Sequence, residues 1–153
     1  KGWRRVRMTA WSQKVRYRFG DIDHAGIAYY PKLLHLFHCA FEDWWADALH
    51  RPYPKLLDED KLGFPVVHLD VDFLAPVVYG EEPTVHVGVL RIGKSSVEFA
   101  FWLVRQDGVP QCCARITTAA VDMDTMKKRE VPQVWRERFA PFAVTDSDLP
   151  KAR

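Results

Sequence analysis

The stretch Phe19-Gly20-Asp21-Ile22-Asp23-His24-Ala25-Gly26-Ile27-Ala28-Tyr29-Tyr30-Pro31 carries the most information about the fold of this chain. It predicts a turn, because glycine and aspartate are typical turn residues, and it lies between a short alternating segment and a long amphipathic one. Pro31 suits the first turn of a helix, where its missing N–H costs nothing. A carboxylate in this turn therefore lies close to the free N–H groups of a helix N-terminus.

The spacing of apolar residues predicts the elements on both sides of the turn. Val15, Tyr17 and Phe19 alternate with three cations, which predicts a half-buried strand over residues 14–19. Apolar side chains at helical spacing predict a helix from Pro31 to about His50, and the proline-rich segment that follows stops it. The neighbours Trp44 and Trp45 point to different sides of this helix, so we expect one in the core and the other near a subunit contact or an acyl pocket.

Strand patterns dominate the second half of the chain. Strands are expected over 66–74, 84–91, 95–105 and 111–122, and a short helix over 133–139. The expected order is one strand, one long helix and four strands in an antiparallel meander. Because the helix is apolar on one side, it must pack on the sheet. The fold class is therefore α+β, with a curved antiparallel sheet wrapped around one long central helix, and an exposed sheet edge favours association of subunits.

Size and composition limit the function classes. The 153 residues suit one domain over 1–153, with 1–12 as an N-terminal extension and 127–153 as a C-terminal tail. A formal net charge of +2 gives no general case for nucleic-acid binding. The cations Lys1, Arg4, Arg5 and Arg7 could form a phosphate-binding arm, although a frayed terminus is more typical of such a segment.

Membrane and metal classes find little support in the sequence. No apolar run reaches the roughly 18 residues that a membrane span requires. Three cysteines without a C-x-x-C spacing favour a reducing, cytoplasmic location and predict no zinc or disulfide framework. His35, His38 and Glu42 share a helix face that could bind zinc, but partner ligands are not evident and a polar helix face is the preferred interpretation.

The paired acids of the turn admit several interpretations. A calcium loop counted from Asp21 fails, since Ala25 occupies its fifth position and Lys32 its twelfth. Both acids could be turn or cap residues, and Asp21 is the better candidate for that role. Asp23 could act as nucleophile or as general base, opposite backbone N–H groups around Tyr30 that would hold a carbonyl oxygen.

Residues 19–31 resemble the active-site segment of the 4-hydroxybenzoyl-CoA thioesterase family of the hotdog fold, in which an Asp-x-Asp-x-x-Gly turn precedes the wrapped helix. The likeness extends to Gly63-Phe64-Pro65-Val66-Val67, Asp72-Phe73 and Glu130-Val131-Pro132. The resemblance implies a hotdog acyl-CoA thioesterase that hydrolyses an acyl- or aryl-CoA, with Asp23 as catalytic carboxylate and the backbone N–H of Tyr30 polarising the thioester carbonyl. It also implies homodimers or homotetramers with interfacial active sites, and no cofactor besides the coenzyme A of the substrate.

Five residues are candidates for substrate binding. Gly26 lets the backbone approach a ligand, and His24 stands where many family members carry a small residue. By register, His38 takes the place of an acid that binds the phenol hydroxyl of the substrate in the enzymes that this chain resembles. The identity of the acyl group is therefore left open. Arg91 and Lys94 flank a turn near which some relatives bind the phosphates of coenzyme A, and the basic run 127–129 is a reserve candidate.

Two rival functions use the same residues. His24 beside Asp23 would suit a hotdog hydratase or dehydratase acting on acyl thioesters, since that chemistry pairs a histidine with an acid. A non-catalytic module would use the tunnel only to bind an acyl thioester or an aromatic ligand. Water addition to a crotonyl-type thioester would identify the first rival, and binding of a CoA ester without turnover the second.

Overall fold

The computed structural model describes residues 10–151, so the basic residues Lys1, Arg4, Arg5 and Arg7 lie outside the described residues. The helices and strands, in chain order, are β1 (Trp11–Lys14), α1 (Tyr30–Asp47), α2 (Tyr53–Asp58), β2 (Leu62–Gly63), β3 (Val66–Phe73), β4 (Thr84–Ile92), β5 (Ser96–Val104), β6 (Pro110–Ala119), β7 (Val121–Asp122) and α3 (Gln133–Phe139). Among these described elements, no helix is long and apolar enough to cross a membrane.

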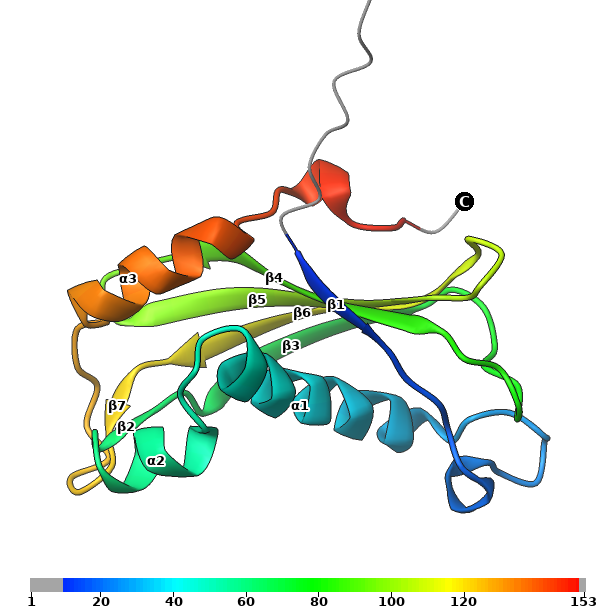
Figure 1. The fold of residues 1–153 in the computed structure, drawn as a ribbon, viewed down its shortest axis with the longest axis horizontal. Helices are drawn as coiled ribbons and strands as arrows, with labels where there is room; N and C mark the ends of the chain where they lie inside the picture. Colours follow the sequence, from blue (N-terminus) through cyan, green and yellow to red (C-terminus); the bar gives the residue numbers. More distant parts are fainter. Residues whose placement is uncertain (1–9, 152–153) are drawn as a thin grey trace, which may run out of the picture.

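A curved antiparallel sheet with α1 along one face forms the centre of the molecule (Figure 1). The apolar stripe of α1 buries Phe37, Phe41, Trp44 and Trp45 against the inner side chains of β4, β5 and β6. Phe41, for example, lies with its ring centroid 5.2 Å from that of Phe99 on β5. The α+β hotdog architecture expected from the sequence is confirmed.

The order of the strands differs from the expected meander. The sheet runs β1-β4-β5-β6-β3, so β3 pairs with β6 and lies at the edge opposite β1. The connection over residues 74–83 carries the chain from this edge back to β4, which begins beside β1 at the pair Lys14 and Thr84. The prediction of a four-strand meander was therefore wrong in its first step, because pairing between strands is non-local and does not follow from spacing along the chain.

The first strand is also placed differently from the prediction. It covers Trp11–Lys14, so it begins in the expected N-terminal extension 1–12 and ends at the first residue of the predicted strand. The ladder with β4 ends where Val15 N–H donates to the carbonyl of Pro83 at 2.9 Å. Beyond that point Tyr17 is buried, but Phe19 is 82% exposed. The alternating pattern over 14–19 therefore predicted the burial of Tyr17 correctly and that of Phe19 wrongly. Since β4 begins at Thr84, it has no residues left to pair with the chain beyond Val15.

The segment expected as a C-terminal tail packs against the rest of the protein. Trp135 and Phe139 of α3 join the main core, where the ring of Trp135 lies 4.8 Å from that of Trp45. Further along, Val144 covers the outer face of the sheet beside Trp102. A Cβ at Gly88 would lie 2.7 Å from Val144, so this close approach requires glycine.

Trp44 and Trp45 are both fully buried. The core position expected for one of them is confirmed, and neither indole reaches the surface of the protomer. Trp45 packs on Tyr53 and Phe64, with 5.9 and 5.8 Å between ring centroids. Helix α3 accounts for this burial. The ring centroid of Phe139 lies 5.4 Å from that of Trp44 and 5.5 Å from that of Trp45, so α3 covers this side of α1.

Candidate active site

Asp23 begins a tight turn immediately before α1. Its backbone N–H donates to the carbonyl of Ile27 at 2.9 Å, and Gly26 N–H donates to the carbonyl of Asp23 at 3.0 Å. Gly26 has φ +83°, a left-handed conformation that favours glycine, while the space around its Cβ position is open. The turn conformation therefore explains Gly26, without a need for close approach of a ligand.

The carboxylate of Asp23 is half-buried and only partly engaged. Its Oδ1 accepts a hydrogen bond from the N–H of Ala25 at 2.8 Å, which fixes the side chain over the turn. Among residues 10–151, no group donates a hydrogen bond to Oδ2 or forms an ion pair with it. One oxygen orients the carboxylate, and the other is available for chemistry.

Asp21 has the structural role that the sequence favoured. Its Oδ2 accepts from the N–H of Arg18 at 2.8 Å and caps the 3-10 turn Phe19–Asp21, and its backbone carbonyl accepts from Tyr29 N–H at 2.8 Å. Lys32 Nζ lies 3.9 Å from its other carboxylate oxygen. These bonds tie the loop that carries Asp23 to the start of α1.

The N-terminus of α1 presents one free amide. Tyr29 is the N-cap without a side-chain cap, Pro31 has no N–H, and Lys32 N–H donates to the carbonyl of Tyr29 at 2.8 Å. Within the described part of the chain, no oxygen accepts a hydrogen bond from Tyr30 N–H. The positive end of the helix dipole and this amide together favour a negatively charged oxygen at this position.

Asp23 and His24 line a recess of about 340 Å³ together with Phe19, Ile22 and Tyr79. Tyr79 comes from the connection 74–83, which crosses beside the turn: Ala28 N–H donates to the carbonyl of Val77 at 2.8 Å, and the rings of Phe19 and Tyr79 meet edge to face at 6.3 Å between centroids. No sequence signal pointed to Tyr79, because this contact depends on the strand order.

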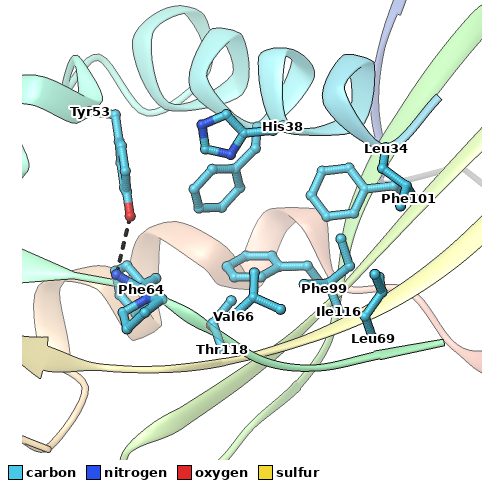
Figure 2. A pocket seen from close by; sticks show the side chains of 12 residues that line it. Leu34, His38, Tyr53, Phe64, Val66, Leu69, Phe99, Phe101, Ile116 and Thr118 are labelled. Atoms are coloured by element: carbon cyan, nitrogen blue, oxygen red, sulfur yellow. Dashed lines mark hydrogen bonds between the residues drawn. The ribbon is translucent and has the colours of Figure 1, made fainter. Parts of the chain in front are cut away.

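A separate apolar pocket of about 340 Å³ lies between α1 and the sheet. Figure 2 shows its side chains converging from the helix and from β3, β5 and β6. The pocket begins at Leu34, one helical turn after Tyr30, and continues to Tyr53, whose hydroxyl accepts from Phe64 N–H at 3.1 Å. Its aromatic walls are Phe41, Tyr53, Phe64, Phe99 and Phe101.

His38 is the one imidazole among the residues that line this pocket. Its Nε2 lies 3.0 Å from a carboxylate oxygen of Glu42, and Figure 2 shows the ring at the pocket. His35, one turn earlier, lies with its Nε2 3.6 Å from the sulfur of Cys39. Across residues 10–151, no three histidine, cysteine or acidic side chains converge as a metal site requires, so the zinc interpretation of this helix face has no structural support.

Arg91 and Lys94 lie far from Asp23 within one chain. They flank the β4–β5 turn, where the carbonyl of Lys94 accepts from Arg136 of α3 at 2.9 Å. Helix α3 packs near the C-terminal end of α1, whereas Asp23 precedes its N-terminal end (Figure 1). Because the 18 residues of α1 span about 27 Å, these sequence-predicted residues are not brought together in a single protomer.

The α+β fold and the carboxylate beside the N-terminus of α1 are those expected of a hotdog thioesterase, and comparison with known families agrees with this class. Residues 17–139 match the model of the thioesterase-like superfamily. The chain belongs to this superfamily, and the resemblance seen in the turn is confirmed.

Curated relatives cover most of the chain. A 1,4-dihydroxy-2-naphthoyl-CoA hydrolase from Synechocystis sp. is 27% identical over 133 residues, which cover 85% of this chain and 91% of that protein. A hydrolase of the same name from Gloeothece citriformis is 24% identical over 136 residues, 86% of this chain and 92% of the relative. The expected enzyme class, a thioester hydrolase, is confirmed at the level of the family.

Solved structures share the architecture. A thioesterase superfamily protein from Jannaschia sp. superimposes with a TM-score of 0.82 at 29% identity and covers 89% of this chain and 94% of that one. A 1,4-dihydroxy-2-naphthoyl-CoA thioesterase from Synechocystis gives a TM-score of 0.77 at 20% identity, over 92% of this chain and 99% of the other, and supports the fold alone.

Proposed function

We propose that the protein hydrolyses an aryl- or acyl-CoA thioester to the free acid and coenzyme A, with Asp23 as the catalytic carboxylate. The observation that carries this proposal is the partly engaged carboxylate of Asp23 in the loop that leads directly to the free amide of Tyr30. A nucleophile or base and an oxyanion donor are the two groups that thioester hydrolysis requires.

Two routes use these groups. In the first, the free oxygen of Asp23 attacks the thioester carbon, the C–S bond breaks, coenzyme A leaves as its thiolate, and water then hydrolyses the mixed anhydride. In the second, Asp23 takes a proton from water as the water attacks the same carbon, the C–S bond then breaks, and coenzyme A leaves as its thiolate, which can take up that proton. In both, the carbonyl oxygen becomes negative and receives the hydrogen bond of Tyr30 N–H at the positive end of α1.

The apolar pocket would hold the acyl group. It begins at Leu34, about 6 Å along the helix axis from Tyr30, so a carbonyl at the Tyr30 amide directs its substituent toward the pocket. Aromatic walls favour an aryl group. The curated relatives named above act on 1,4-dihydroxy-2-naphthoyl-CoA, and we assign His38, beside Glu42, to a hydroxyl on the ring.

The proposed functional unit is a homodimer formed through β3, with tetramers as a further level of assembly. This edge strand is exposed along its length, with Val66 and Val67 58% and 60% exposed and Phe73 55% exposed. Long apolar edges of this kind pair with another chain. Because Val66 and Leu69 also line the apolar pocket, a second protomer on this edge would help to close it.

The proposed reaction assigns no role to a metal or a prosthetic group. The carboxylate, the backbone amide and water supply every atom that the two routes require. Hydrolysis by the purified protein is therefore expected to continue unchanged after treatment with EDTA and dialysis.

A panel of thioesters tests the proposal. Purified protein is incubated with benzoyl-, 4-hydroxybenzoyl-, 1,4-dihydroxy-2-naphthoyl-, butyryl- and palmitoyl-CoA, and release of the thiol is followed with a chromogenic disulfide. Fastest hydrolysis is expected for a hydroxylated aryl ester. Hydration of crotonyl-CoA in place of hydrolysis, or calorimetric binding of these esters with no release of thiol, would overturn the proposal in favour of a hydratase or a binding module.

A further inference from the structure

The connection between β3 and β4, residues 74–83, adjoins the candidate active site. Ala28 N–H donates to the carbonyl of Val77 at 2.8 Å, and a β-bridge pairs Ile27 with Val78. The connection and the turn before α1 lie together at the end of the molecule where β4 begins (Figure 1). The turn that carries the candidate carboxylate is therefore held against a segment that contains no helix or strand.

The same connection supplies part of the wall of the active-site recess. Tyr79 lines this recess together with Asp23. Its side chain is 57% exposed, and its ring partner Phe19 is 82% exposed, so packing at the recess does little to hold the wall in place. The contacts that fix the connection must therefore lie on its other side.

Gln111, the second residue of β6, supplies those contacts and is fully buried. Its backbone carbonyl accepts from Leu74 N–H at 2.9 Å and from Ala75 N–H at 3.1 Å. Its side-chain Nε2 donates to the carbonyl of Pro76 at 3.2 Å and to Oε2 of Glu81 at 2.7 Å. One residue thus binds the connection at its start and near its end.

The bond between Gln111 and Glu81 is expected to be the strongest of these contacts, because a hydrogen bond to a charged acceptor is about twice as strong as one between neutral groups. Arg105 also attracts the charge of Glu81, but the hydrogen bonds of its guanidinium go to Asp107. Within residues 10–151, Oε1 of Gln111 accepts no hydrogen bond. The side chain therefore acts through its two N–H donors.

We propose that Gln111 is a positioning residue of the active site. It does not line the recess and acts through the connection, which bonds to Ala28 on one side of the recess and supplies Tyr79 to its wall. The inference rests on the proposed function, because it requires Asp23 to be the catalytic carboxylate. A displacement of about 1 Å at reacting groups can cost about 100-fold in rate, so loss of the tether lowers kcat.

Kinetics of matched variants test this role. Gln111→Met keeps the length of the side chain and removes both donors, and kcat is expected to fall about 10-fold with KM unchanged. Glu81→Gln keeps an acceptor for Nε2 and should retain most of the activity, whereas Glu81→Leu should approach Gln111→Met. Gln13→Met is the control, since Gln13 Nε2 also donates to a carboxylate, Asp43 Oδ2 at 2.8 Å, but between β1 and α1. Wild-type kcat in Gln111→Met, or an equal loss in Gln13→Met, would overturn the proposal.

Hydrogen exchange measured by mass spectrometry separates the tether from the hydrolysis. In Gln111→Met, peptides covering 23–30 and 74–83 should exchange about 10-fold faster than in wild type, as for the loss of about one hydrogen bond, and in Gln13→Met they should exchange at the wild-type rate. Circular dichroism and the melting temperature verify the fold of each variant. Glu81→Leu, on the connection itself, repeats the test from the acceptor side if the buried substitution unfolds the protein.

The two measurements fail in different ways. Unchanged exchange in a folded Gln111→Met would overturn the tether, and faster exchange with wild-type kcat would overturn its role in the reaction. If the wild type hydrolyses no thioester, the proposed function fails, whereas hydrogen exchange still decides whether Gln111 holds the turn before α1.

Discussion

The two ends of α1 carry opposite chemistry. At the N-terminal end, the Asp23 carboxylate stands in a loop beside the Tyr30 amide, among the exposed rings of Phe19, Tyr30 and Tyr79. In the part of the chain that the structure describes, neither that amide nor one oxygen of the carboxylate has a hydrogen-bond partner. At the C-terminal end, Arg51, Arg129 and Arg138 line a polar cavity with one carboxylate, that of Asp60. The helix dipole favours this arrangement, since it stabilises negative charge at the first turn and positive charge at the last.

This difference separates the end of α1 that carries the proposed catalytic carboxylate from an end whose surface is mainly cationic. In the proposed reaction, an oxyanion at Tyr30 would be stabilised by a fixed backbone amide, whereas the cations at the other end are flexible side chains. The 18 residues of α1, about 27 Å of helix, separate the two ends within one protomer.

Loss of the Asp23 carboxylate has the largest expected effect. Asp23→Asn keeps the oxygen that accepts from Ala25 N–H but removes the charge, so kcat is expected to fall about 10³-fold. Asp47→Asn, at the exposed end of α1, is the matched control and should retain wild-type activity. Steady-state kinetics on the best thioester of the panel gives both values. Full activity in Asp23→Asn would remove this residue from the mechanism.

Deletion of one backbone N–H tests the other half of the catalytic end. Proline is tolerated in the first turn of a helix, and the extended Tyr29 (φ −66°, ψ 126°) is compatible with a following proline, so Tyr30→Pro removes the amide donor while α1 persists. We expect kcat to fall about 10²-fold, as for loss of one oxyanion donor. Tyr30→Ala retains the N–H and serves as control for the side chain. Equal activity of the two variants would contradict the role of the amide.

A charge on the exposed edge tests the assembly. Val67→Lys places two lysines close together when β3 strands pair, and we expect the dimer Kd to rise about 30-fold, with activity lost on dilution. Ser12→Lys adds the same charge to β1, the opposite edge of the sheet, and should leave the dimer intact. Sedimentation velocity over a concentration series measures both. A Val67→Lys protein that stays dimeric would place the interface elsewhere.

His38 lies between the two ends and is expected to affect selectivity. Replacing it by phenylalanine removes one hydrogen bond to a ring hydroxyl, which should lower the ratio of kcat/KM for 4-hydroxybenzoyl-CoA to that for benzoyl-CoA about 10-fold. His35→Phe changes a histidine one turn earlier that does not line the pocket, and should leave the ratio unchanged. An unchanged ratio in His38→Phe would show that the hydroxyl is bound by another group.

The smallest effect concerns a residue outside both ends. His86 is buried in a stack with Trp102, and desolvation by burial lowers the pKa of its imidazole below the ordinary value. Below about pH 6.5 the imidazole of His86 binds a proton in the unfolded chain but stays neutral in the folded protein. The free energy of unfolding should therefore decrease as the pH falls through this range. Denaturation with urea between pH 8 and pH 5 should show a weaker decrease for His86→Phe than for wild type. His35→Gln, an exposed control, should follow wild type, and identical curves for His86→Phe and wild type would contradict the assignment.

The limits of most helices and strands were predicted well, because turn residues and apolar spacing act over a few neighbouring residues. Helix α3 occurs where expected, over Gln133–Phe139, and the four strands after α1 start or end within a few residues of their predicted limits. The strand order was not predictable. β3 lies at the edge because it pairs with β6, which is far from it in the sequence, and such non-local pairing does not follow from spacing along the chain. Tyr79 in the Asp23 recess and both buried tryptophans follow from that order and from the docking of α3.

The sequence by itself determined the turn, the helix that follows it and the residue types that thioester chemistry requires, because turn, cap and amphipathic signals act over a few neighbouring residues. Tertiary structure alone decided the rest. Within residues 10–151, it left one oxygen of Asp23 without a hydrogen bond, put Arg91 and Lys94 at the far end of α1, and gathered Arg51, Arg129 and Arg138 from segments far apart in the chain. Such placements depend on how elements pack on a shared core, which spacing along the sequence does not encode.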